Sequence, residues 1–232
     1  MQVRALSLDL DDTLWPVAPA LEEADRAVDA YLQVHFPRVA HAWPIPAMRT
    51  LRMQVAEARP ELAHDFTAQR QLTLHEAFAR CGIVAAPIDT LWEIYFSARN
   101  TVSLFPDSLP ALAQLAARWP LASLTNGNAD LARIGLQAHF RCAVAAREVG
   151  VGKPDPRIFR VAANRLGVAA GELLHVGDDP ELDVLGAHRA GLHTAWVNRR
   201  GLPWPTALGT APDVTVRDLG ELVRWLDADA GT

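Results

Sequence analysis

The chain has 232 residues, half of them hydrophobic, and a formal net charge of −5. This length allows one large domain or one domain with an inserted module, and the hydrophobic fraction allows a sizeable core. The acidic balance and the lack of a basic block argue against nucleic acid as a partner, and no apolar stretch is long enough for a secretory signal or a membrane span.

The two cysteines, Cys81 and Cys142, stand outside any metal-ligand spacing. Two cysteines do not make a disulfide framework, so we expect two buried small side chains in a reducing compartment. The sequence thus predicts a cytoplasmic protein without membrane association. The sequence has no exposed apolar stripe from which an oligomer could be predicted, so the oligomeric state stays open.

The first predicted element is a buried strand at residues 3–8. Residues 16–101 follow, with apolar side chains at steps of three and four and prolines that divide the segment into about four helices. From Phe105 onward helices alternate with strands, the helices at 109–119, 129–136, 156–166, 181–190 and 219–226 and the strands at 121–124, 142–145, 173–176, 193–197 and 214–216.

Such alternation with short loops predicts an α/β fold in which helices cover both faces of a parallel sheet. We expect residues 1–15 and 102–232 to form this core and residues 16–101 to form a helical insert. The insert directly follows the first strand, which is where a cap over a site would lie. We expect such a cap to open for substrate and to close against bulk water.

Unusual polar residues follow four of the predicted strands, at the edge where parallel sheets bind ligands. They are Asp9, Asp11 and Thr13 after the first strand, Thr125, Asn126 and Gly127 after the second, Lys153 after the third, and Asp178, Asp179 and Asp183 after the fourth. Lys153 is the only lysine of the chain and lies between glycines and prolines that fix a loop. We therefore expect Lys153 to be a point charge held in a defined position rather than a lysine retained by accident.

Several carboxylates at one sheet edge repel one another and lose hydration, and a Mg²⁺ ion relieves both costs. We predict Mg²⁺ held by the carboxylates of Asp9 and Asp178 and by the main-chain carbonyl of Asp11. The ion would also take a phosphate oxygen of the substrate. Asp183 is predicted to stand behind the metal ligands, with Asp179 and Thr13.

The remaining roles follow from charge and hydrogen-bonding capacity. Thr125, the N–H groups of Asn126 and Gly127 at a helix N-terminus, and Lys153 are predicted to bind the phosphate. Asp9 would attack phosphorus to form an aspartyl-phosphate. Asp11 would protonate the leaving alkoxide and then deprotonate the water that hydrolyses the intermediate.

These motifs, in this order, resemble the four motifs of the haloacid dehalogenase (HAD) superfamily: Asp9-x-Asp11-x-Thr13, Thr125, Lys153-Pro154 and Gly177-Asp178-Asp179 with Asp183. The resemblance covers the whole predicted core and implies a Rossmann-like sheet, a Mg²⁺ cofactor and an aspartyl-phosphate. The helical insert is similar to the family's first type of cap.

Two activities of the superfamily are disfavoured by particular residues. The dehalogenases lack the second aspartate of the first motif, because a leaving halide needs no proton, whereas Asp11 is present here. The phosphonate hydrolases need a cap lysine for a Schiff base, and the single lysine here lies in the core. A phosphatase remains, with a phosphotransferase as a variant, acting on a small-molecule phosphate ester.

A closer resemblance links cap and core to bacterial FMN phosphatases, which also act on the phosphorylated ribitylamino-uracil precursor of riboflavin. It rests on the segments Ala58-Arg59-Pro60-Glu61, His64-Asp65-Phe66-Thr67, Trp119-Pro120-Leu121, Thr125-Asn126-Gly127-Asn128 and Leu174-His175-Val176-Gly177-Asp178-Asp179. Trp15 departs from this pattern, in which tyrosine is expected. Two alternatives stay open: a phosphatase for sugar phosphates or nucleotides, and a non-enzymatic regulator that kept a phosphate-binding core.

Overall fold

The computed structural model describes residues 2–229, so Met1 and residues 230–232, at the ends of the predicted core, lie outside the described residues. The chain divides into two compact units. The first comprises the residues up to Pro16, Ser103–Gly127 and those from Gly135 onward. The second comprises Val17–Val102 together with Asn128–Ile134, so a short piece of the predicted core belongs to the helical unit.

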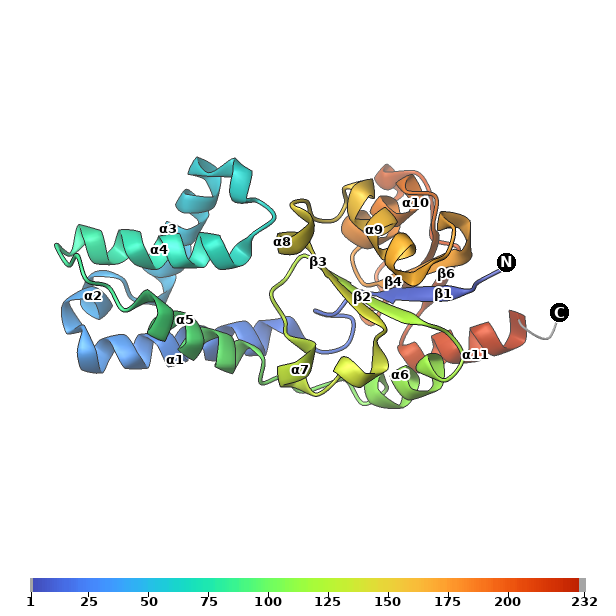
Figure 1. Ribbon diagram of the computed structural model, residues 1–232, viewed down its shortest axis with the longest axis horizontal. Helices are drawn as coiled ribbons and strands as arrows, with labels where there is room; N and C mark the ends of the chain where they lie inside the picture. Colours follow the sequence, from blue (N-terminus) through green and yellow to red (C-terminus); the bar gives the residue numbers. More distant parts are fainter. Residues whose placement is uncertain (1, 230–232) are drawn as a thin grey trace. The chain divides into compact units, whose positions relative to one another are not determined.

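The first unit, whose sheet strands are drawn as arrows in Figure 1, is built on a six-stranded parallel sheet. The strand order is β3-β2-β1-β4-β5-β6. The strands are β1 (Ala5–Leu8), β2 (Leu121–Thr125), β3 (Cys142–Ala145), β4 (Leu173–Gly177), β5 (His193–Val197) and β6 (Val214–Val216). Every residue of β1, β2 and β4 is buried, which is typical of a parallel sheet covered on both faces. The predicted α/β fold with a Rossmann-like parallel sheet is therefore confirmed.

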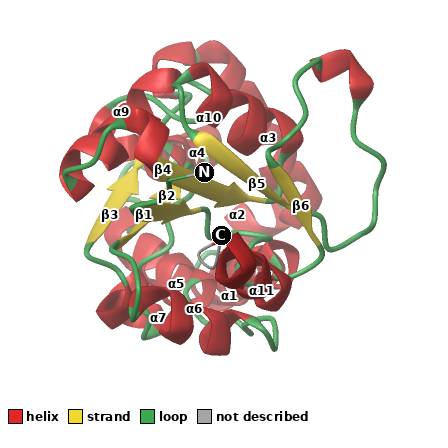
Figure 2. Cartoon of the chain, turned by 90° about the vertical axis from the view of Figure 1, so that its right-hand side faces the viewer, coloured by secondary structure: helices red, strands yellow, loops and turns green. Residues whose placement is uncertain are grey.

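Helices cover both faces of this sheet (Figure 2). On one face lie α9 (Pro156–Leu166) and α10 (Gly186–Arg189), and on the other α6 (Ser108–Ala116) and α11 (Leu219–Asp229). Short helical segments complete the unit: α8 (Ala146–Val149), the 3₁₀ turns at Gln137–His139, Ala170–Glu172 and Thr206–Leu208, and the π-helix η4 (Pro180–Leu185). Apolar side chains of α9, among them Ile158 and Phe159, pack on β2 and β3 to form the core.

Local signals explain the start and end of α9. The side chain of Asp155 accepts a hydrogen bond from the N–H of Arg157 (2.9 Å), and Pro156 takes the first helical position. The helix ends at Gly167, whose φ of 74° is in the left-handed region that favours glycine. The predicted bounds of this helix agree with the structure.

Two predicted helices of the second half differ strongly in extent from the structure, and two others differ by three residues at one end, since α6 ends at Ala116 and α11 continues to Asp229. The helix expected at 129–136 is only α7 (Leu131–Ile134), because Asp130 caps its start and Gly135, at φ 86°, ends it. The helix expected at 181–190 is the π-helix η4 followed by α10. A π-helix frequently marks a functional site, and Asp183 lies within this one.

The second unit is helical and consists of α1 (Val17–His35), α2 (Pro37–Ala42), α3 (Ile45–Ala58), a 3₁₀ turn (Pro60–Leu62), α4 (Phe66–Arg80) and α5 (Ile88–Arg99), with α7. Five α-helices thus replace the four expected in this stretch, since the prolines at 37 and 44 separate α2 from its neighbours. The helices share one apolar core that includes Leu32, Leu51 and Phe78.

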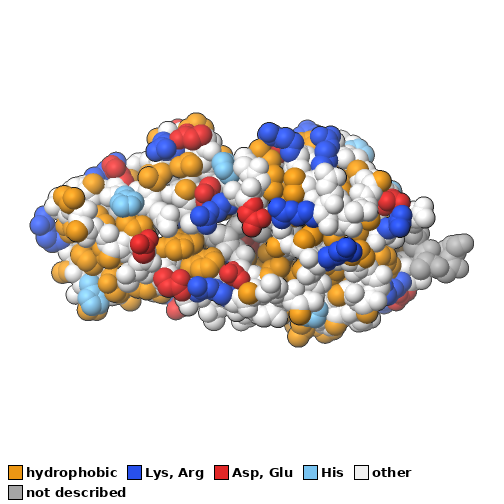
Figure 3. All heavy atoms as spheres, viewed as in Figure 1, with side chains coloured by type: hydrophobic (Ala, Val, Ile, Leu, Met, Phe, Trp, Pro, Cys, Tyr) orange, Lys and Arg blue, Asp and Glu red, His pale blue; other side chains and the backbone are white. Residues whose placement is uncertain are grey.

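The surface bears on the partners predicted from charge. Acidic and basic side chains both occur over the face drawn in Figure 3, with several basic side chains gathered over its right-hand part. Within residues 2–229, no helix is both long and apolar enough to cross a bilayer. Cys81 and Cys142 are free thiols and half-buried rather than buried. The cytoplasmic location and the absence of a nucleic-acid partner stay predictions.

Candidate active site

The acidic residues singled out in the sequence meet where β1 and β4 end. β1 lies between β2 and β4 in the sheet, and the N–H of Asp9, just past β1, donates to the carbonyl of Val176 in β4 (2.9 Å). Asp178 directly follows β4, so both carboxylates emerge at the same edge. The carboxyl ends of neighbouring parallel strands must meet in this way.

Lys153 connects two of these carboxylates. Its ammonium group donates to Oδ1 of Asp9 and to Oδ1 of Asp183, each at 2.5 Å. The side chains of Lys153 and Asp183 are 3% and 2% exposed, so this ion pair lies in the protein interior. A buried charge persists only with close partners, and each of these groups has one.

The pKa directions indicate which of these groups carry charge. Burial opposes ionisation of Lys153, but the charges of Asp183 and Asp9 outweigh it and raise the pKa of the lysine. Burial likewise opposes ionisation of Asp183, yet Lys153 and the hydrogen bond from His175 hold its pKa well below the usual range. Lys153 and Asp183 therefore form a charged pair.

The other two carboxyl groups are shifted the opposite way. Burial raises the pKa of Asp9 by more than Lys153 lowers it, and the charges of Asp183 and Asp178 add to the rise. Burial and the charge of Asp183 raise the pKa of Asp178 to about 7. The site thus holds more acidic groups than its single ammonium group compensates.

This donor set fits a divalent cation. Asp9, Asp178 and Asp183 each offer one carboxylate oxygen, and these three atoms lie within 4.8 Å of one another. Mg²⁺ prefers oxygen ligands and adds the positive charge that the cluster lacks. The sequence predicted Asp183 behind the metal ligands, but the structure places one of its carboxylate oxygens within the cluster itself, where it is also bonded to Lys153.

The carboxylate of Asp11 is oriented by Trp15. The indole N–H of Trp15 donates to Oδ1 of Asp11 at 2.9 Å, and the tryptophan side chain is fully buried. The N–H of Asp12 donates to the carbonyl of Trp15 (2.7 Å), and Asp12 has a left-handed φ of 59°. This tight loop turns the Asp11 side chain toward the indole, so the tryptophan at the position of an expected tyrosine has a definite partner.

Two further predicted residues surround the acidic cluster. The hydroxyl of Thr13 lies 3.4 Å from Oδ2 of Asp9 and 3.3 Å from Oδ1 of Asp178. The side chain of Asp179 accepts from the N–H groups of Glu181 and Leu182 (both 2.8 Å) and thereby caps η4. Both residues hold the loops from which the carboxylates project.

Gly177 makes the close approach of Asp183 feasible. A Cβ at position 177 would lie 2.2 Å from Cγ of Asp183, which no side chain tolerates. Oδ2 of Asp183 also accepts from the N–H of Asp179 (3.0 Å). The glycine therefore lets η4 fold back against the end of β4.

The predicted phosphate-binding segment after β2 differs from expectation. The N–H groups of Asn126 and Gly127 do not lie at a helix N-terminus, because α7 begins only at Leu131. The N–H of Gly127 donates instead to the hydroxyl of Thr125 (2.9 Å). The expectation of a helix-terminal phosphate site is therefore wrong, although the loop itself adjoins the site.

The side chain of Asn126 has a role that the sequence did not suggest. Its amide donates to the carbonyl of Lys153 (2.9 Å), and its carbonyl oxygen accepts from the N–H of Lys153 (2.7 Å). These paired bonds fix the backbone of the lysine loop against the end of β2. The Lys153–Pro154 peptide bond in this loop is cis.

A buried histidine supports Asp183 from within the sheet. Nε2 of His175 lies 3.0 Å from Oδ1 of Asp183, and Nδ1 lies 2.9 Å from the hydroxyl of Ser7. Burial lowers the pKa of His175, so the ring is neutral. Because ionised Asp183 only accepts, Nε2 must donate to it and Ser7 must donate to Nδ1. A histidine within an otherwise apolar strand was the available signal.

Two contacts from the far end of the chain had no local signal. The indole N–H of Trp196 in β5 donates to the carbonyl of Asp178 (2.8 Å). Arg199 donates to the carbonyl of Thr13 (2.8 Å) and forms two hydrogen bonds with Asp107 (2.9 and 2.8 Å). The loops after β1 and β4 are thus held by side chains distant in sequence.

Comparison with known proteins identifies the family of the chain. Residues 3–191 match the family model of haloacid dehalogenase-like hydrolases. The chain is 33% identical over 200 residues to the 5-amino-6-(5-phospho-D-ribitylamino)uracil phosphatase YigB of Escherichia coli, a match that covers 84% of each chain. It is 36% identical over 249 residues to the phosphoserine phosphatase of Thermus thermophilus, covering 95% of this chain and 98% of that one.

Among solved structures, the chain is similar to a 2-haloacid dehalogenase from Pseudomonas syringae pv. Tomato. The TM-score is 0.90 at 33% identity, and the match covers 97% of this chain and 99% of that one. Proteins similar to this chain are therefore named for two different reactions, phosphate ester hydrolysis and dehalogenation.

Proposed function

The chain belongs to the haloacid dehalogenase-like hydrolases, and from this premise we propose that it is a Mg²⁺-dependent phosphatase of a small phosphorylated metabolite. The observation that carries the proposal is the ammonium group of Lys153 between Asp9 and Asp183, with Asp178 beside them. A nucleophilic carboxylate, a fixed cation and a metal-ligand set are the parts that phosphoryl transfer to a carboxylate needs.

Asp9 is the proposed nucleophile. Its carboxylate attacks phosphorus, the bond from phosphorus to the ester oxygen breaks, and an aspartyl-phosphate forms. Water then attacks this phosphorus and releases inorganic phosphate and the free carboxylate. The Lys153 ammonium group favours the ionised form of Asp9 and offsets negative charge on the phosphoryl group.

Asp11 is the proposed general acid and base. It gives its proton to the ester oxygen as the alcohol leaves, and in the second step it takes a proton from the attacking water. Asp11 accepts a hydrogen bond from Trp15, whereas Asp9 accepts one from Lys153, so the two acidic groups of the first motif have different surroundings. The loop after β2, with Thr125, Asn126 and Gly127, is proposed to bind the phosphate together with Lys153, without the helix N-terminus that the sequence predicted.

We propose that Mg²⁺ is bound by the carboxylates of Asp9 and Asp178 and by the main-chain carbonyl of Asp11, with Asp183 next to these ligands. The positions of the ligands would be fixed by Asp179 and Thr13. When bound, the ion supplies positive charge to a phosphate oxygen. The helical residues 16–101 are proposed as the cap and the remainder as the catalytic core.

A phosphatase fits the residues better than a dehalogenase, although the similar Pseudomonas structure is named as one. A halide leaves as a stable anion, whereas an alkoxide must be protonated. Asp11, oriented by a dedicated hydrogen bond, provides a proton donor that dehalogenation would not use. The same residue argues against a regulator that only binds phosphate.

For the substrate we propose the phosphorylated ribitylamino-uracil or FMN. The similarity to the Escherichia coli phosphatase YigB supports the ribitylamino-uracil phosphate. The segments that resemble FMN phosphatases lie in both units of the chain and support FMN. The Thermus relative, named a phosphoserine phosphatase, makes phosphoserine the main rival. Sugar phosphates and nucleotides complete the set to be compared.

The test is a panel of these phosphate esters, ranked by kcat/KM for phosphate release with Mg²⁺ and with a chelator. We expect activity only with the metal, and the highest value for a ribityl phosphate. Asp9→Asn should abolish turnover. Its matched control is Asp89→Asn, at an exposed position of α5, which should behave as the wild type.

Each result has a distinct meaning. Full activity of Asp9→Asn would refute the nucleophile assignment. Release of halide from a 2-haloacid without phosphate release from any ester would refute the phosphatase. A highest kcat/KM for phosphoserine would refute the ribityl substrate and leave the phosphatase standing.

A further inference from the structure

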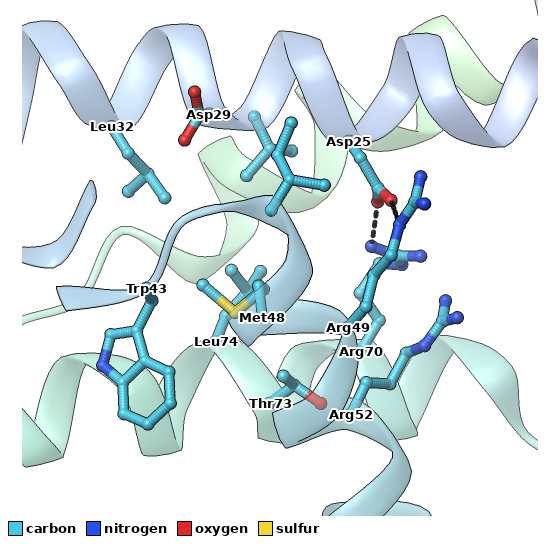
Figure 4. Close-up of a pocket in the computed structure, with 12 residues that line it drawn as sticks. Asp25, Asp29, Leu32, Trp43, Met48, Arg49, Arg52, Arg70, Thr73 and Leu74 are labelled. Atoms are coloured by element: carbon cyan, nitrogen blue, oxygen red, sulfur yellow. Dashed lines mark hydrogen bonds and ion pairs between the residues drawn. The ribbon is translucent and has the colours of Figure 1, made fainter. Parts of the chain in front are cut away.

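A pocket within the helical unit combines cationic and apolar walls. It lies between α1, α3 and α4 and opens to solvent, and the empty space inside it and at its open mouth together amounts to about 510 Å³. Its apolar wall consists of Val28, Leu32, Trp43, Ile45, Met48 and Leu74. The guanidinium groups of Arg49, Arg52 and Arg70 gather at one end, and Leu32 and Trp43 lie at the other (Figure 4).

Two of the three arginines share one carboxylate. Arg49 donates to Oδ2 of Asp25 (2.8 Å), and Arg70 donates to Oδ1 of the same group (2.9 Å). The guanidinium of Arg70 also lies 3.6 Å from the ring centre of Tyr95. Both oxygens of Asp25 thus already have a guanidinium donor, and Arg70 is fixed on an aromatic face.

Arg52 is left without such a partner. Within residues 2–229 no carboxylate forms a hydrogen bond or an ion pair with it, and its side chain is half-buried at the pocket wall. Burial, followed by the neighbouring charge of Arg70, lowers the pKa of Arg52. A guanidinium stays charged in proteins, so here it keeps an uncompensated charge in a partly desolvated place.

The remaining acidic group of the pocket lies elsewhere. Asp29 follows Asp25 by one turn of α1 and projects near Leu32, away from the guanidinium end (Figure 4). Three arginines and two aspartates leave the lining one positive charge in excess. Asp29 would repel an anion from the far end, so the charges also define an orientation.

We propose that this pocket binds an organic anion that has an apolar body, with its carboxylate or phosphate on Arg52 and its body against Leu32, Met48 and Leu74. Small-molecule sites are typically apolar hollows with a few placed polar groups, and this pocket has that form. The planar guanidinium donates in a fork that matches either anionic group. The site lies within one unit, and the proposal does not depend on phosphatase activity.

The test measures binding of 2-naphthoate to the full-length protein by titration calorimetry. Two probes separate the contributions: 2-naphthylmethanol has the same body without the charge, and acetate has the charge without the body. We expect naphthoate to bind at least about tenfold more tightly than either probe, since a charge-assisted hydrogen bond is worth that much. Equal binding of the alcohol would overturn the proposal.

Variants identify the residue responsible. Arg52→Gln should weaken naphthoate by about tenfold or more, and Arg52→Lys, which keeps the charge but not the fork, should weaken it less. The matched control is Arg26→Gln on the exposed side of α1, where Arg26 pairs with Glu23 (2.7 Å). Thermal unfolding checks that each variant is folded. Unchanged naphthoate binding by folded Arg52→Gln would overturn the proposal.

A competition experiment separates this pocket from the acidic site. Naphthoate is titrated again with Mg²⁺ and inorganic phosphate at saturating concentrations, and with Asp9→Asn. We expect the same affinity in both cases. Loss of naphthoate binding under phosphate would assign the ligand to the phosphate site and refute the pocket, whereas absence of phosphatase activity would refute only the proposed function.

Discussion

The hydrogen bond from Trp15 to Asp11 leads to a prediction about leaving groups. Trp15→Phe keeps a buried aromatic ring but removes the indole N–H that lies 2.9 Å from the carboxylate. Hydrogen bonds to charged groups contribute about 1.5–3 kcal/mol. If the bond orients the proton donor at the transition state, its loss lowers kcat by about tenfold to a hundredfold.

This loss should depend on the substrate. An alkyl phosphate releases a strongly basic alkoxide and needs the proton from Asp11, whereas 4-nitrophenyl phosphate releases a stable phenolate. We expect Trp15→Phe to slow alkyl phosphates by the factor above and to leave 4-nitrophenyl phosphate close to the wild-type rate. The assay is kcat for a series of phosphate monoesters of rising leaving-group basicity.

The control separates positioning from packing. Trp92→Phe makes the same substitution in α5, in the unit that does not contain the acidic cluster, and thermal unfolding is measured for both variants. A purely structural role of Trp15 would lower kcat equally for all esters. An equal loss across the series, or no loss for alkyl esters, would refute the assignment of Trp15 as the residue that positions Asp11.

Three further predictions concern the buried charges. Lys153→Ala leaves two buried carboxylates without their cation and should cost about 3–5 kcal/mol in urea unfolding together with most of the activity, so a near-normal rate would contradict its electrostatic role. Without metal, the free energy of unfolding should fall as pH rises from about 4 to 7, because Asp178 in the folded protein, with a pKa of about 7, keeps a proton that the unfolded chain releases. In melting curves measured as a function of pH, Mg²⁺ should reverse this fall and Asp178→Asn should flatten it. Gly177→Ala should lower Tm and Mg²⁺ affinity together, since its Cβ would meet Asp183, and unchanged calorimetric binding would exclude this close approach.

The raised pKa of Asp178 and the lowered pKa of Asp183 have one explanation, which is the number of cationic partners that each carboxylate has. Asp183 is ionised because it has Lys153 and His175 as partners, while Asp178 has no cation of its own at hydrogen-bond distance among the described residues. A divalent ion would therefore act mainly on Asp178 and Asp9. Metal affinity is expected to rise with pH for the same reason.

Much of the architecture could be read from local pattern. The buried strand before Asp9, the helix 156–166 with its aspartate cap and the strand before Asp178 have short-range signals, and the structure has them at nearly the same residues. The π-helix at Pro180–Leu185 had no such signal. Its geometry depends on how Asp183 packs under Gly177, which periodicity does not encode.

The sequence by itself determined which chemical groups stand at the strand ends, because alternation of strand and helix forces a parallel sheet whose carboxyl ends converge. Only the tertiary structure decided their pairing. Lys153 forms hydrogen bonds with Asp183 as well as with Asp9. The indole of Trp15 donates to Asp11, and the ring of His175 is hydrogen-bonded to Asp183. These pairings depend on side-chain direction and burial, and both are set by residues that lie far apart in the chain and meet only on folding.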